Sequence, residues 1–566
     1  MALTTVSALS TGCGSTPKPA DLVLLHGNVV TLDPARPRAQ ALATRGDTIA
    51  AVGSDHEIGK LIGPKTRVID LQGRLTIPGF IEGHAHFVSL GQSKRILDLH
   101  TARNWDEIVA RVEAAARTAP PGAWILGRGW HQEKWVSRPS PSVSGYPVRD
   151  ALDRVAAGHP VRLRHASGHA SIVNALALER AGIGPETPDP PGGTILKGRS
   201  GRPTGVLIEA ADDAVQRAVD ADRARLPAAE VDAELRHDVE LATDECLSKG
   251  ITTFHDAGED LKTVDGFRNM AVAGELRIRL YVMLSDGDDV IAPRLAEGPL
   301  LELGRRHLTV RAIKRYMDGA LGSHGAWMLA PYADLPGDRG LPAQPVERLE
   351  ATARLAAEHG FQLCVHAIGD RGNHEVLDVY ERTFRAFPAL KDARFRVEHA
   401  QHLDPADIPR FAHLGVIAAM QGIHCTSDGP WVVERIGEDR ARTGAYAWRR
   451  LLDSGAVVVN GTDAPVEDVD PIACFHASVT RKMKDGAAFF AEQRMTREEA
   501  LRSYTASGAY AGFEEGIKGT LTPGKLADVV VLSRDILAVT DDEVLEARVL
   551  WTIVGGGIAF RAEEAR

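Results

Sequence analysis

Pro78-Gly-Phe-Ile-Glu-Gly-His84-Ala-His86 is the stretch from which the fold of this chain can be worked out. Its apolar residues are typical of a buried strand, and the alternation of side chains along a strand puts His84 and His86 on the same face. Two imidazoles at the carboxyl end of one strand can chelate a metal ion. A His-x-His pair also arises by chance, so its meaning depends on the rest of the chain.

Four more side chains suited to a metal site lie in or at the ends of apolar segments. His366 ends Phe361-Gln-Leu-Cys-Val, His399 follows Phe395-Arg-Val-Glu, Asp463 follows Val457-Val-Val-Asn-Gly-Thr, and Lys314 lies inside the strand that begins at Val310. The active sites of (β/α)₈ barrels lie at the carboxyl ends of the strands. Because buried charges without partners are costly, the set favours a shared site over unrelated core residues.

Strand patterns and helix patterns alternate through the middle of the chain. Eight candidate strands, with helical stretches between several of them, predict a (β/α)₈ barrel. These strands are Thr76–Glu82, Ile251–Asp256, Arg277–Leu284, Val310–Asp318, Phe361–His366, Phe395–His399, Val416–Gln421 and Val457–Asp463. A single βα unit needs roughly 30 residues, so most of the long interval between the first two strands must be an insertion, which we interpret as a lid or subdomain.

Both ends of the chain read as short strands separated by turns, as in Leu22–Leu25 and Ala527–Leu532. We therefore expect the ends to pair into one small β-sandwich. The predicted organisation has four segments. They are a signal or tether segment (1–20), the N-terminal strands of the sandwich (21–77), the hydrolase barrel (78–510, insertion about 90–236) and the C-terminal strands of the sandwich (511–566).

Composition narrows the class of protein. With 66 Lys and Arg against 76 Asp and Glu, the formal net charge is −10, which argues against a nucleic-acid binder. No run of 18 apolar residues predicts a membrane-spanning helix. The five cysteines show no C-x-x-C spacing, so we expect neither a disulfide framework nor a thiolate metal site. We expect a small-molecule substrate, and both a monomer and a homo-oligomer remain open.

The segment before Pro19 offers two interpretations. The small and apolar residues up to Cys13 resemble the end of a bacterial lipoprotein signal, which would place the protein in the cell envelope with a lipid on Cys13 as its only link to the membrane. Ser10 stands where leucine is usual in such signals, and no basic residue precedes it. The alternative is a disordered tail on a cytoplasmic protein.

The order His-x-His, Lys, His, His, Asp along the chain resembles the amidohydrolase superfamily, and finer motifs are similar to its N-substituted formamide deformylase-like branch. The similarity runs from about Asp21 to the C-terminus. The motifs are Gly250-Ile-Thr-Thr-Phe-His-Asp256, Met317-Asp-Gly-Ala-Leu-Gly322, His366-Ala-Ile-Gly-Asp-Arg371, Val397-Glu-His-Ala-Gln401, Gly461-Thr-Asp-Ala-Pro465 and Gly519-Thr-Leu-Thr-Pro-Gly-Lys-Leu-Ala-Asp528.

This resemblance implies a binuclear site and its ligands. His84 and His86 would bind one metal and His366 and His399 the other, while a carbamylated Lys314 would bridge them. Asp463 would bind the first metal and act as general base on a bridging water, from which the attacking hydroxide arises. Imidazole and carboxylate ligands favour zinc, with manganese and iron as alternatives.

The resemblance also implies substrate contacts. His169 and Asn174 belong to a segment, His165-Ala-Ser-Gly-His169 with Asn174, that is similar to one of that branch. His324 stands where the branch often has arginine. It is a candidate substrate contact, but the binding of an anionic group by such an arginine is not implied for this chain.

Three functions are consistent with these residues. The first is hydrolysis of the C–N bond of an amide, formamide or carbamate. The second is a deaminase or cyclic amidohydrolase acting on a ring substrate. The third is an envelope binding protein whose site has decayed, against which the complete ligand set argues.

Overall fold

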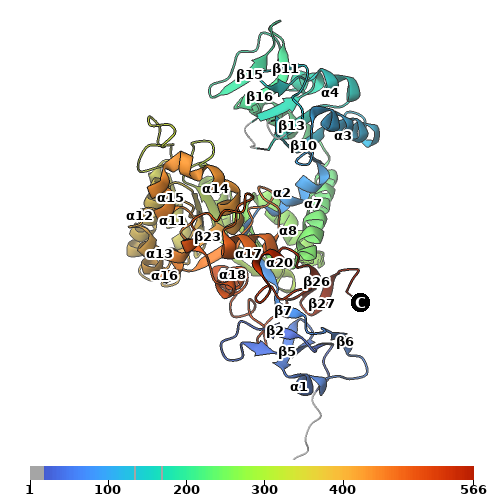
Figure 1. The fold of residues 1–566 in the computed structure, drawn as a ribbon, viewed down its shortest axis with the longest axis vertical. Helices are drawn as coiled ribbons and strands as arrows, with labels where there is room; N and C mark the ends of the chain where they lie inside the picture. Colours follow the sequence, from blue (N-terminus) through green and yellow to red (C-terminus); the bar gives the residue numbers. More distant parts are fainter. Residues whose placement is uncertain (1–17, 133–134, 167–169, 566) are drawn as a thin grey trace, which may run out of the picture. The chain divides into compact units, whose positions relative to one another are not determined.

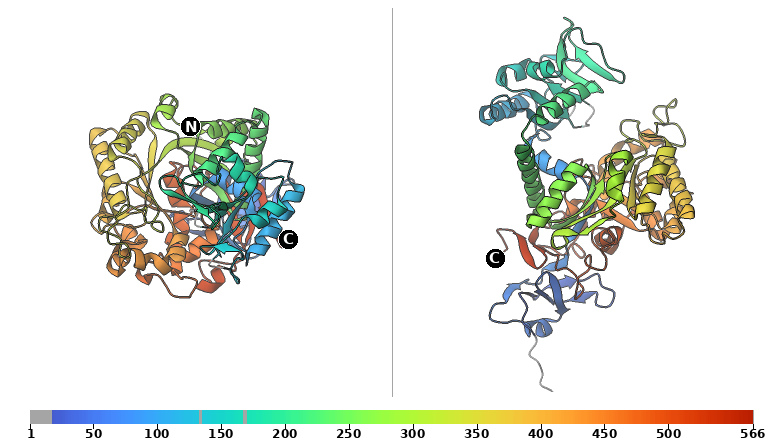
Figure 2. Two further views of the ribbon diagram at one scale, coloured as in Figure 1. Left: turned by 90° about the horizontal axis from the view of Figure 1, so that it is seen from above. Right: turned by 180° about the vertical axis from the view of Figure 1, so that it is seen from behind.

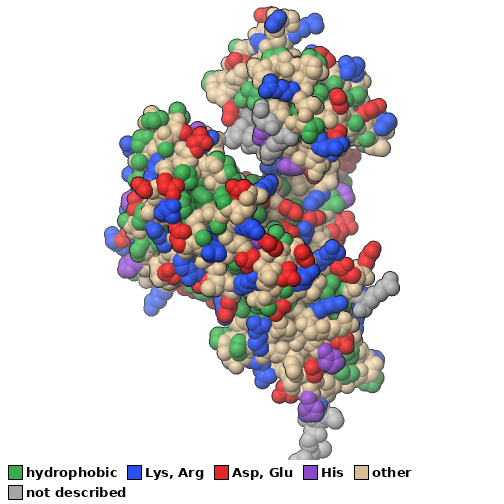
Figure 3. Space-filling model, viewed as in Figure 1, with side chains coloured by type: hydrophobic (Ala, Val, Ile, Leu, Met, Phe, Trp, Pro, Cys, Tyr) green, Lys and Arg blue, Asp and Glu red, His purple; other side chains and the backbone are tan. Residues whose placement is uncertain are grey.

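The computed structural model describes residues 18–132, 135–166 and 170–565 in two compact units. The first unit runs to His86 and resumes at Glu245, and the second comprises Phe87–Asp244. Cys13 and His169 lie outside the described residues. Of the helices in the described regions of the chain, none combines the length and apolar character needed to cross a membrane. Acidic and basic side chains are interspersed over the face shown in Figure 3.

Eight parallel strands form the barrel of the first unit (Figure 1). In spatial order they are β8 (Phe80–Ala85), β17 (Ile251–Glu259), β18 (Arg279–Leu284), β20 (Leu308–Tyr316), β21 (Gln362–Ala367), β22 (Arg396–His399), β23 (Ile417–Gln421) and β24 (Val458–Gly461). The predicted barrel is therefore confirmed.

Helices cover the outside of these strands (Figure 2). They include α8 (Leu261–Ala273), α11 (Val346–His359), α12 (Asp370–Ala386), α13 (Ile408–Leu414), α16 (Trp448–Asp453) and α17 (Pro471–Thr480). Local sequence sets their ends: Asp260 caps α8 by accepting the Thr263 N–H at 2.7 Å, and α11 ends at Gly360, which has a φ of 74°. Glycine adopts that left-handed conformation without steric cost.

The first predicted strand, Thr76–Glu82, is two strands in the structure. Leu75–Pro78 (β7) belongs to the sandwich, whereas β8 belongs to the barrel. Gly79 separates them, and a Cβ atom there would lie 2.2 Å from the Thr252 hydroxyl. The Gly79 N–H donates to the Asp528 carbonyl on the sandwich side, and the next N–H donates to the Gly250 carbonyl on the barrel side. A single residue thus carries the chain from one sheet to the other.

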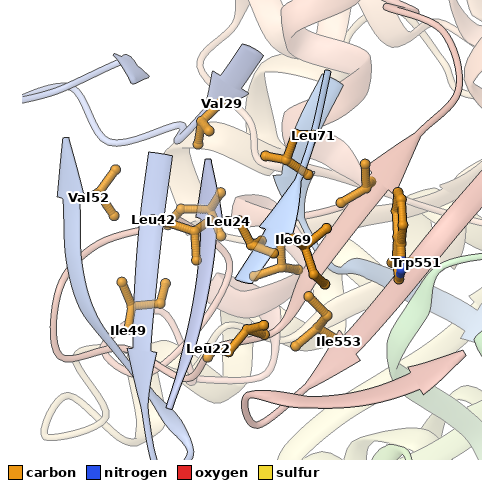
Figure 4. Packing of buried hydrophobic residues seen from close by; sticks show 14 of the residues in the cluster. Leu22, Leu24, Val29, Leu42, Ile49, Val52, Ile69, Leu71, Trp551 and Ile553 are labelled. Carbon is orange, nitrogen blue, oxygen red and sulfur yellow. The ribbon is translucent and has the colours of Figure 1, made fainter. Parts of the chain in front are cut away.

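The chain ends form the two sheets of the sandwich. One is ordered β5-β4-β1-β6 and the other β27-β26-β25-β7-β2-β3. Their strands are β1 (Leu22–Leu25), β2 (Asn28–Val30), β3 (Arg38–Ala39), β4 (Ala41–Arg45), β5 (Thr48–Gly53), β6 (Arg67–Asp70), β25 (Val529–Leu532), β26 (Val549–Val554) and β27 (Gly557–Arg561). Leu24 and Leu42 from the N-terminal strands share one buried cluster with Trp551 and Ile553 from β26 (Figure 4).

The second unit, which follows β8 in sequence, contains one mixed sheet ordered β15-β16-β14-β13-β10-β9. Its strands are β9 (Leu97–Asp98), β10 (Ile125–Trp130), β13 (Val161–His165), β14 (Ala170–Val173), β15 (Gly193–Lys197) and β16 (Pro203–Glu209). One buried cluster contains Ile108 of α3 (Trp105–Thr118) and Leu163, and another contains Leu178 of α5 (Ala175–Arg180) and Leu207. The insertion therefore has cores of its own.

Candidate metal centre

The closing edge of the barrel brings Asp463 to the first histidine pair. Asp463 follows β24, and its N–H donates to the His84 carbonyl at 2.8 Å. The His86 N–H donates to the Ala464 carbonyl, also at 2.8 Å. These bonds link the carboxyl ends of β8 and β24, which are the two ends of the strand order. The Nε2 atoms of His84 and His86 consequently lie 3.6 and 3.3 Å from Asp463 Oδ1.

The second histidine pair lies against the first. The His399 ring is 4.8 Å from the His84 ring and 4.5 Å from the His366 ring, between centroids. One ligand atom each from His84, His399 and Asp463 falls within a group whose members are at most 4.8 Å apart. The structure therefore brings both predicted pairs and the predicted aspartate to one place at the barrel mouth.

The backbone is strained at two of these residues. His399 has a φ of 72° and Asp463 a φ of 59°, both in the left-handed region that non-glycine residues rarely adopt. Strain of this kind costs on the order of 1–3 kcal/mol and tends to occur at functional sites. The left-handed conformation turns the backbone sharply at the ends of the two strands, where the side chains of His399 and Asp463 join the cluster.

Lys314 is the buried cation of the site. Its side chain is 1% exposed, and its Nζ lies 4.7 Å from the centre of the Tyr316 ring. That ring is in turn 5.3 Å from the His366 ring. Within the described regions of the chain, no carboxylate forms an ion pair with this ammonium group. Burying an ammonium group without a direct ion pair is unfavourable, and carbamylation would convert it into an oxygen anion able to bind metals.

The protonation states of the cluster suit a cation. Burial, together with the charge of Lys314, lowers the pKa of His84 to about 4 and that of His366 to about 3. Burial alone would raise the pKa of Asp463, but its hydrogen bond with His86 and the neighbouring imidazoles hold it well below the ordinary value. Neutral imidazoles and an ionised carboxylate are the forms that bind metal. The buried Nε2 atoms of His84 and His366 accept no hydrogen bond from any described residue, so the residues present fit a metal site.

Three side chains that lie next to the histidines of the cluster were not predicted. Glu398 contacts His84 Nδ1, Gln421 Oε1 is 2.7 Å from His399 Nδ1, and Asp318 Oδ1 is 3.6 Å from His366 Nε2. Burial raises the pKa of Asp318 to about 7, although three backbone N–H groups donate to it. The sequence does carry a signal for Glu398, because it lies two residues from Arg396, a charge of opposite sign, in the short buried strand β22.

The predicted substrate contacts that the structure describes have hydrogen-bond partners of their own. His324 bonds to Asp334 at 3.1 Å, and Asp334 also pairs with Arg435. Asn174, in the second unit, is 1% exposed, accepts the Val161 and Ala177 N–H groups and donates to two carbonyls. These hydrogen bonds account for an asparagine at this position without requiring that it bind a substrate. Substrate binding by His169, Asn174 and His324 stays a prediction.

A barrel whose mouth gathers four histidines, an aspartate and a buried lysine defines a metal-dependent hydrolase of the (β/α)₈ type. The amidohydrolase family model matches residues 67–560, and the chain belongs to that family. Its relatives include Protein LONG AFTER FAR-RED 3 from Arabidopsis thaliana, 33% identical over 95% of this chain and 91% of that protein. The N-substituted formamide deformylase of Arthrobacter pascens is 29% identical over 95% of this chain and 98% of the enzyme.

Solved structures show the same fold. An uncharacterized metal-dependent hydrolase from Pyrococcus horikoshii OT3 superposes with a TM-score of 0.75. It is 24% identical and covers 92% of this chain and 99% of its own. The family match and the end-to-end similarity to the formamide deformylase confirm the resemblance that the sequence motifs indicated.

Proposed function

We propose that the protein hydrolyses the C–N bond of a small amide, formamide or carbamate. The observation that carries the proposal is the cluster in which neutral imidazoles surround the ionised Asp463 at the barrel mouth. The end-to-end similarity to a formamide deformylase supports the choice of bond. An apolar group on the nitrogen is the substrate feature that we expect.

Two divalent metals, most simply zinc, belong to this proposal. His84, His86 and Asp463 would hold one, His366 and His399 would hold the other, and carbamylated Lys314 would bridge them. Once bound, the metals would supply Lewis acidity that lowers the pKa of water and polarises a carbonyl group.

Asp463 performs the proton transfers. It accepts a proton from the attacking water as the water oxygen bonds to the carbonyl carbon, and it donates that proton to the nitrogen as the C–N bond breaks. An amide thus gives an acid and an amine. His86, whose Nε2 is 3.3 Å from Asp463 Oδ1, orients the carboxylate. Mobility of Asp463 is restricted further by its backbone bond to the His84 carbonyl.

The test is a product assay on zinc-loaded protein with a panel of N-substituted formamides, amides and carbamates. Release of a primary amine is expected, together with a carboxylic acid from formamides and amides, or with carbon dioxide and an alcohol from carbamates. Release of ammonia from ring substrates instead would identify a deaminase. A purified protein that takes up no metal would favour a binding protein with a decayed site. Asp463→Asn is the matched control, since it keeps the shape of the side chain but cannot act as a base.

A further inference from the structure

Three fully buried charged or polar side chains, linked by hydrogen bonds, lie behind His84 in the barrel interior. Glu398 and Arg396, both on β22, are each 0% exposed, and so is His255 on β17. None of them is a metal ligand of the proposed function, on which this inference rests.

Arg396 fixes Glu398 with a two-pronged contact. Its Nε donates to Oε1 at 2.7 Å and its Nη2 donates to Oε2 at 2.9 Å. The same Nη2 donates to the Gly83 carbonyl at 2.7 Å, so it also holds the backbone next to His84. The remaining nitrogen, Nη1, is 3.0 Å from His255 Nδ1. Bidentate pairs of this kind restrict both partners geometrically.

These contacts determine which nitrogen of His84 carries the proton. Arginine only donates hydrogen bonds, and an ionised carboxylate only accepts them. Glu398 Oε2 contacts His84 Nδ1, so Nδ1 is the protonated nitrogen and donates. Nε2 then keeps its lone pair, and it is this atom that lies 3.6 Å from Asp463 Oδ1.

His399 has a weaker arrangement of the same kind. Its Nδ1 is 2.7 Å from Gln421 Oε1, a neutral amide oxygen. The Gln421 amide accepts a hydrogen bond in the same way, but it carries no charge. A carboxylate partner makes an imidazole a more basic ligand than an amide does. His84 and His399, one from each pair, therefore differ in the residue that contacts their Nδ1 atoms.

We propose that Glu398, held by Arg396, is a positioning residue that fixes His84 in the tautomer presenting Nε2 to a metal ion, and that it thereby sets the metal affinity of the site formed with His86. The side chain touches neither substrate nor metal. Its effect passes through the imidazole alone, and it should be confined to one of the two metal positions.

The experiment measures zinc binding to the metal-free protein by competition with a chromophoric chelator. Wild type should bind two zinc ions. In Glu398→Gln the charge is lost and the shape is kept, and the affinity of one zinc ion should fall by about 10–100-fold while the other is unchanged. Cobalt in the weakened position should also show an altered visible spectrum, because the imidazole is no longer fixed.

Glu82→Gln is the matched control. Glu82 is also 0% exposed, but its Oε1 accepts backbone N–H groups, that of Thr462 at 2.6 Å and that of His84 at 3.4 Å, and no imidazole nitrogen of the described residues bonds to it. Gln retains that acceptor, so both zinc affinities should equal those of wild type. Equal weakening of both zinc ions by Glu398→Gln, or no weakening, would overturn the proposal. A wild type that binds no zinc would instead overturn the proposed function.

A second variant covers the case in which Glu398→Gln does not fold because Arg396 is left unpaired. Arg396→Met combined with Glu398→Leu removes both charges, and replacing a complete buried ion pair in this way is often neutral for stability. The same selective loss of one zinc affinity is expected. Two unchanged affinities in a folded double variant would overturn the proposal.

Discussion

Two arginine–carboxylate pairs with both partners buried, among the described residues of the first unit, differ in what else the carboxylate contacts. Arg279 on β18 pairs with Asp528 through two bonds of 2.8 and 3.0 Å, and Asp528 also accepts the Gly555 N–H at 2.8 Å. That pair ends on a turn of the sandwich. Glu398 ends on an imidazole whose other nitrogen faces the metal centre. A buried, charge-paired carboxylate is therefore not by itself a sign of function. What distinguishes the two pairs is the additional group that the carboxylate contacts, a backbone N–H for Asp528 and an imidazole for Glu398.

Lys314 extends this comparison, because it is a buried cation that forms no ion pair with a carboxylate of the described residues. Lys314→Ala should remove at least one metal and nearly all turnover, since the bridging oxygen anion is lost. Metal analysis by mass spectrometry and a turnover assay would measure both. Short carboxylic acids should partly restore activity by occupying the vacated space. Two retained metals with full turnover would contradict the bridging role.

Asp463 tests the catalytic role of the residues at the metal centre. Asp463→Asn should lower kcat by about 10²–10⁴-fold, the usual contribution of a positioned acid–base group. Thermal unfolding should stay close to wild type, because the amide preserves the shape. Steady-state kinetics on metal-loaded protein provides the measurement. Near wild-type turnover in a folded variant with both metals would rule out this base.

Asp528 tests whether the second arginine–carboxylate pair serves stability alone. Asp528→Asn leaves Arg279, which is 2% exposed, without its carboxylate, and should cost about 3–5 kcal/mol of unfolding free energy. Denaturant titration would measure the loss, while zinc affinity should not change. If Asp528→Asn lowered zinc affinity as much as Glu398→Gln does, the distinction between the two pairs would be wrong.

The same variant has a pH signature. Burial alone would raise the pKa of Asp528, but Arg279 lowers it below the ordinary value of 3.8. A carboxylate with a depressed pKa stabilises the fold above its ordinary pKa, and that stability is lost as the pH falls through the folded value. The stability difference between wild type and Asp528→Asn should be complete at pH 7 and shrink below pH 3.8.

Asn174 gives the smallest expected effect. Asn174→Ala removes a helix cap and leaves buried backbone groups unpaired, which should cost about 1–3 kcal/mol. If its role is the structural one shown by its hydrogen bonds, KM should not change. A raised KM in a stable variant would support the substrate contact that the sequence predicts and would show that a capping residue can serve both purposes.

The sequence predicted the barrel and the gathering of histidines and an aspartate at its mouth, because both depend on local patterns. A polar residue at the end of an apolar strand signals its place at the barrel mouth, as for His366 and Asp463. The strand Ala41–Arg45 has only a weak sequence signal, since alanine-rich segments have little strand preference. Gly79 was not recognised as the point where one sheet gives way to another.

The residues behind the ligands were not predicted because their partners are distant in sequence. Glu398 and His84 are 314 residues apart, and only the closed barrel brings them together. Glu398 by itself also has an ordinary interpretation as half of an ion pair with Arg396. Nothing in a local pattern distinguishes it from Asp528.

The sandwich also determines when the protein can complete its folding during synthesis, because its strands come from both ends of the chain. Asn28 and Asp535, which bond at 2.7 Å across it, are 507 residues apart. At the roughly 5–20 residues per second of ribosomal elongation, the edge of β7 that pairs with β25 stays without its partner for on the order of a minute. Strand edges left unpaired for that time invite association with other chains. The nascent protein should therefore depend on chaperones more than its finished barrel would suggest.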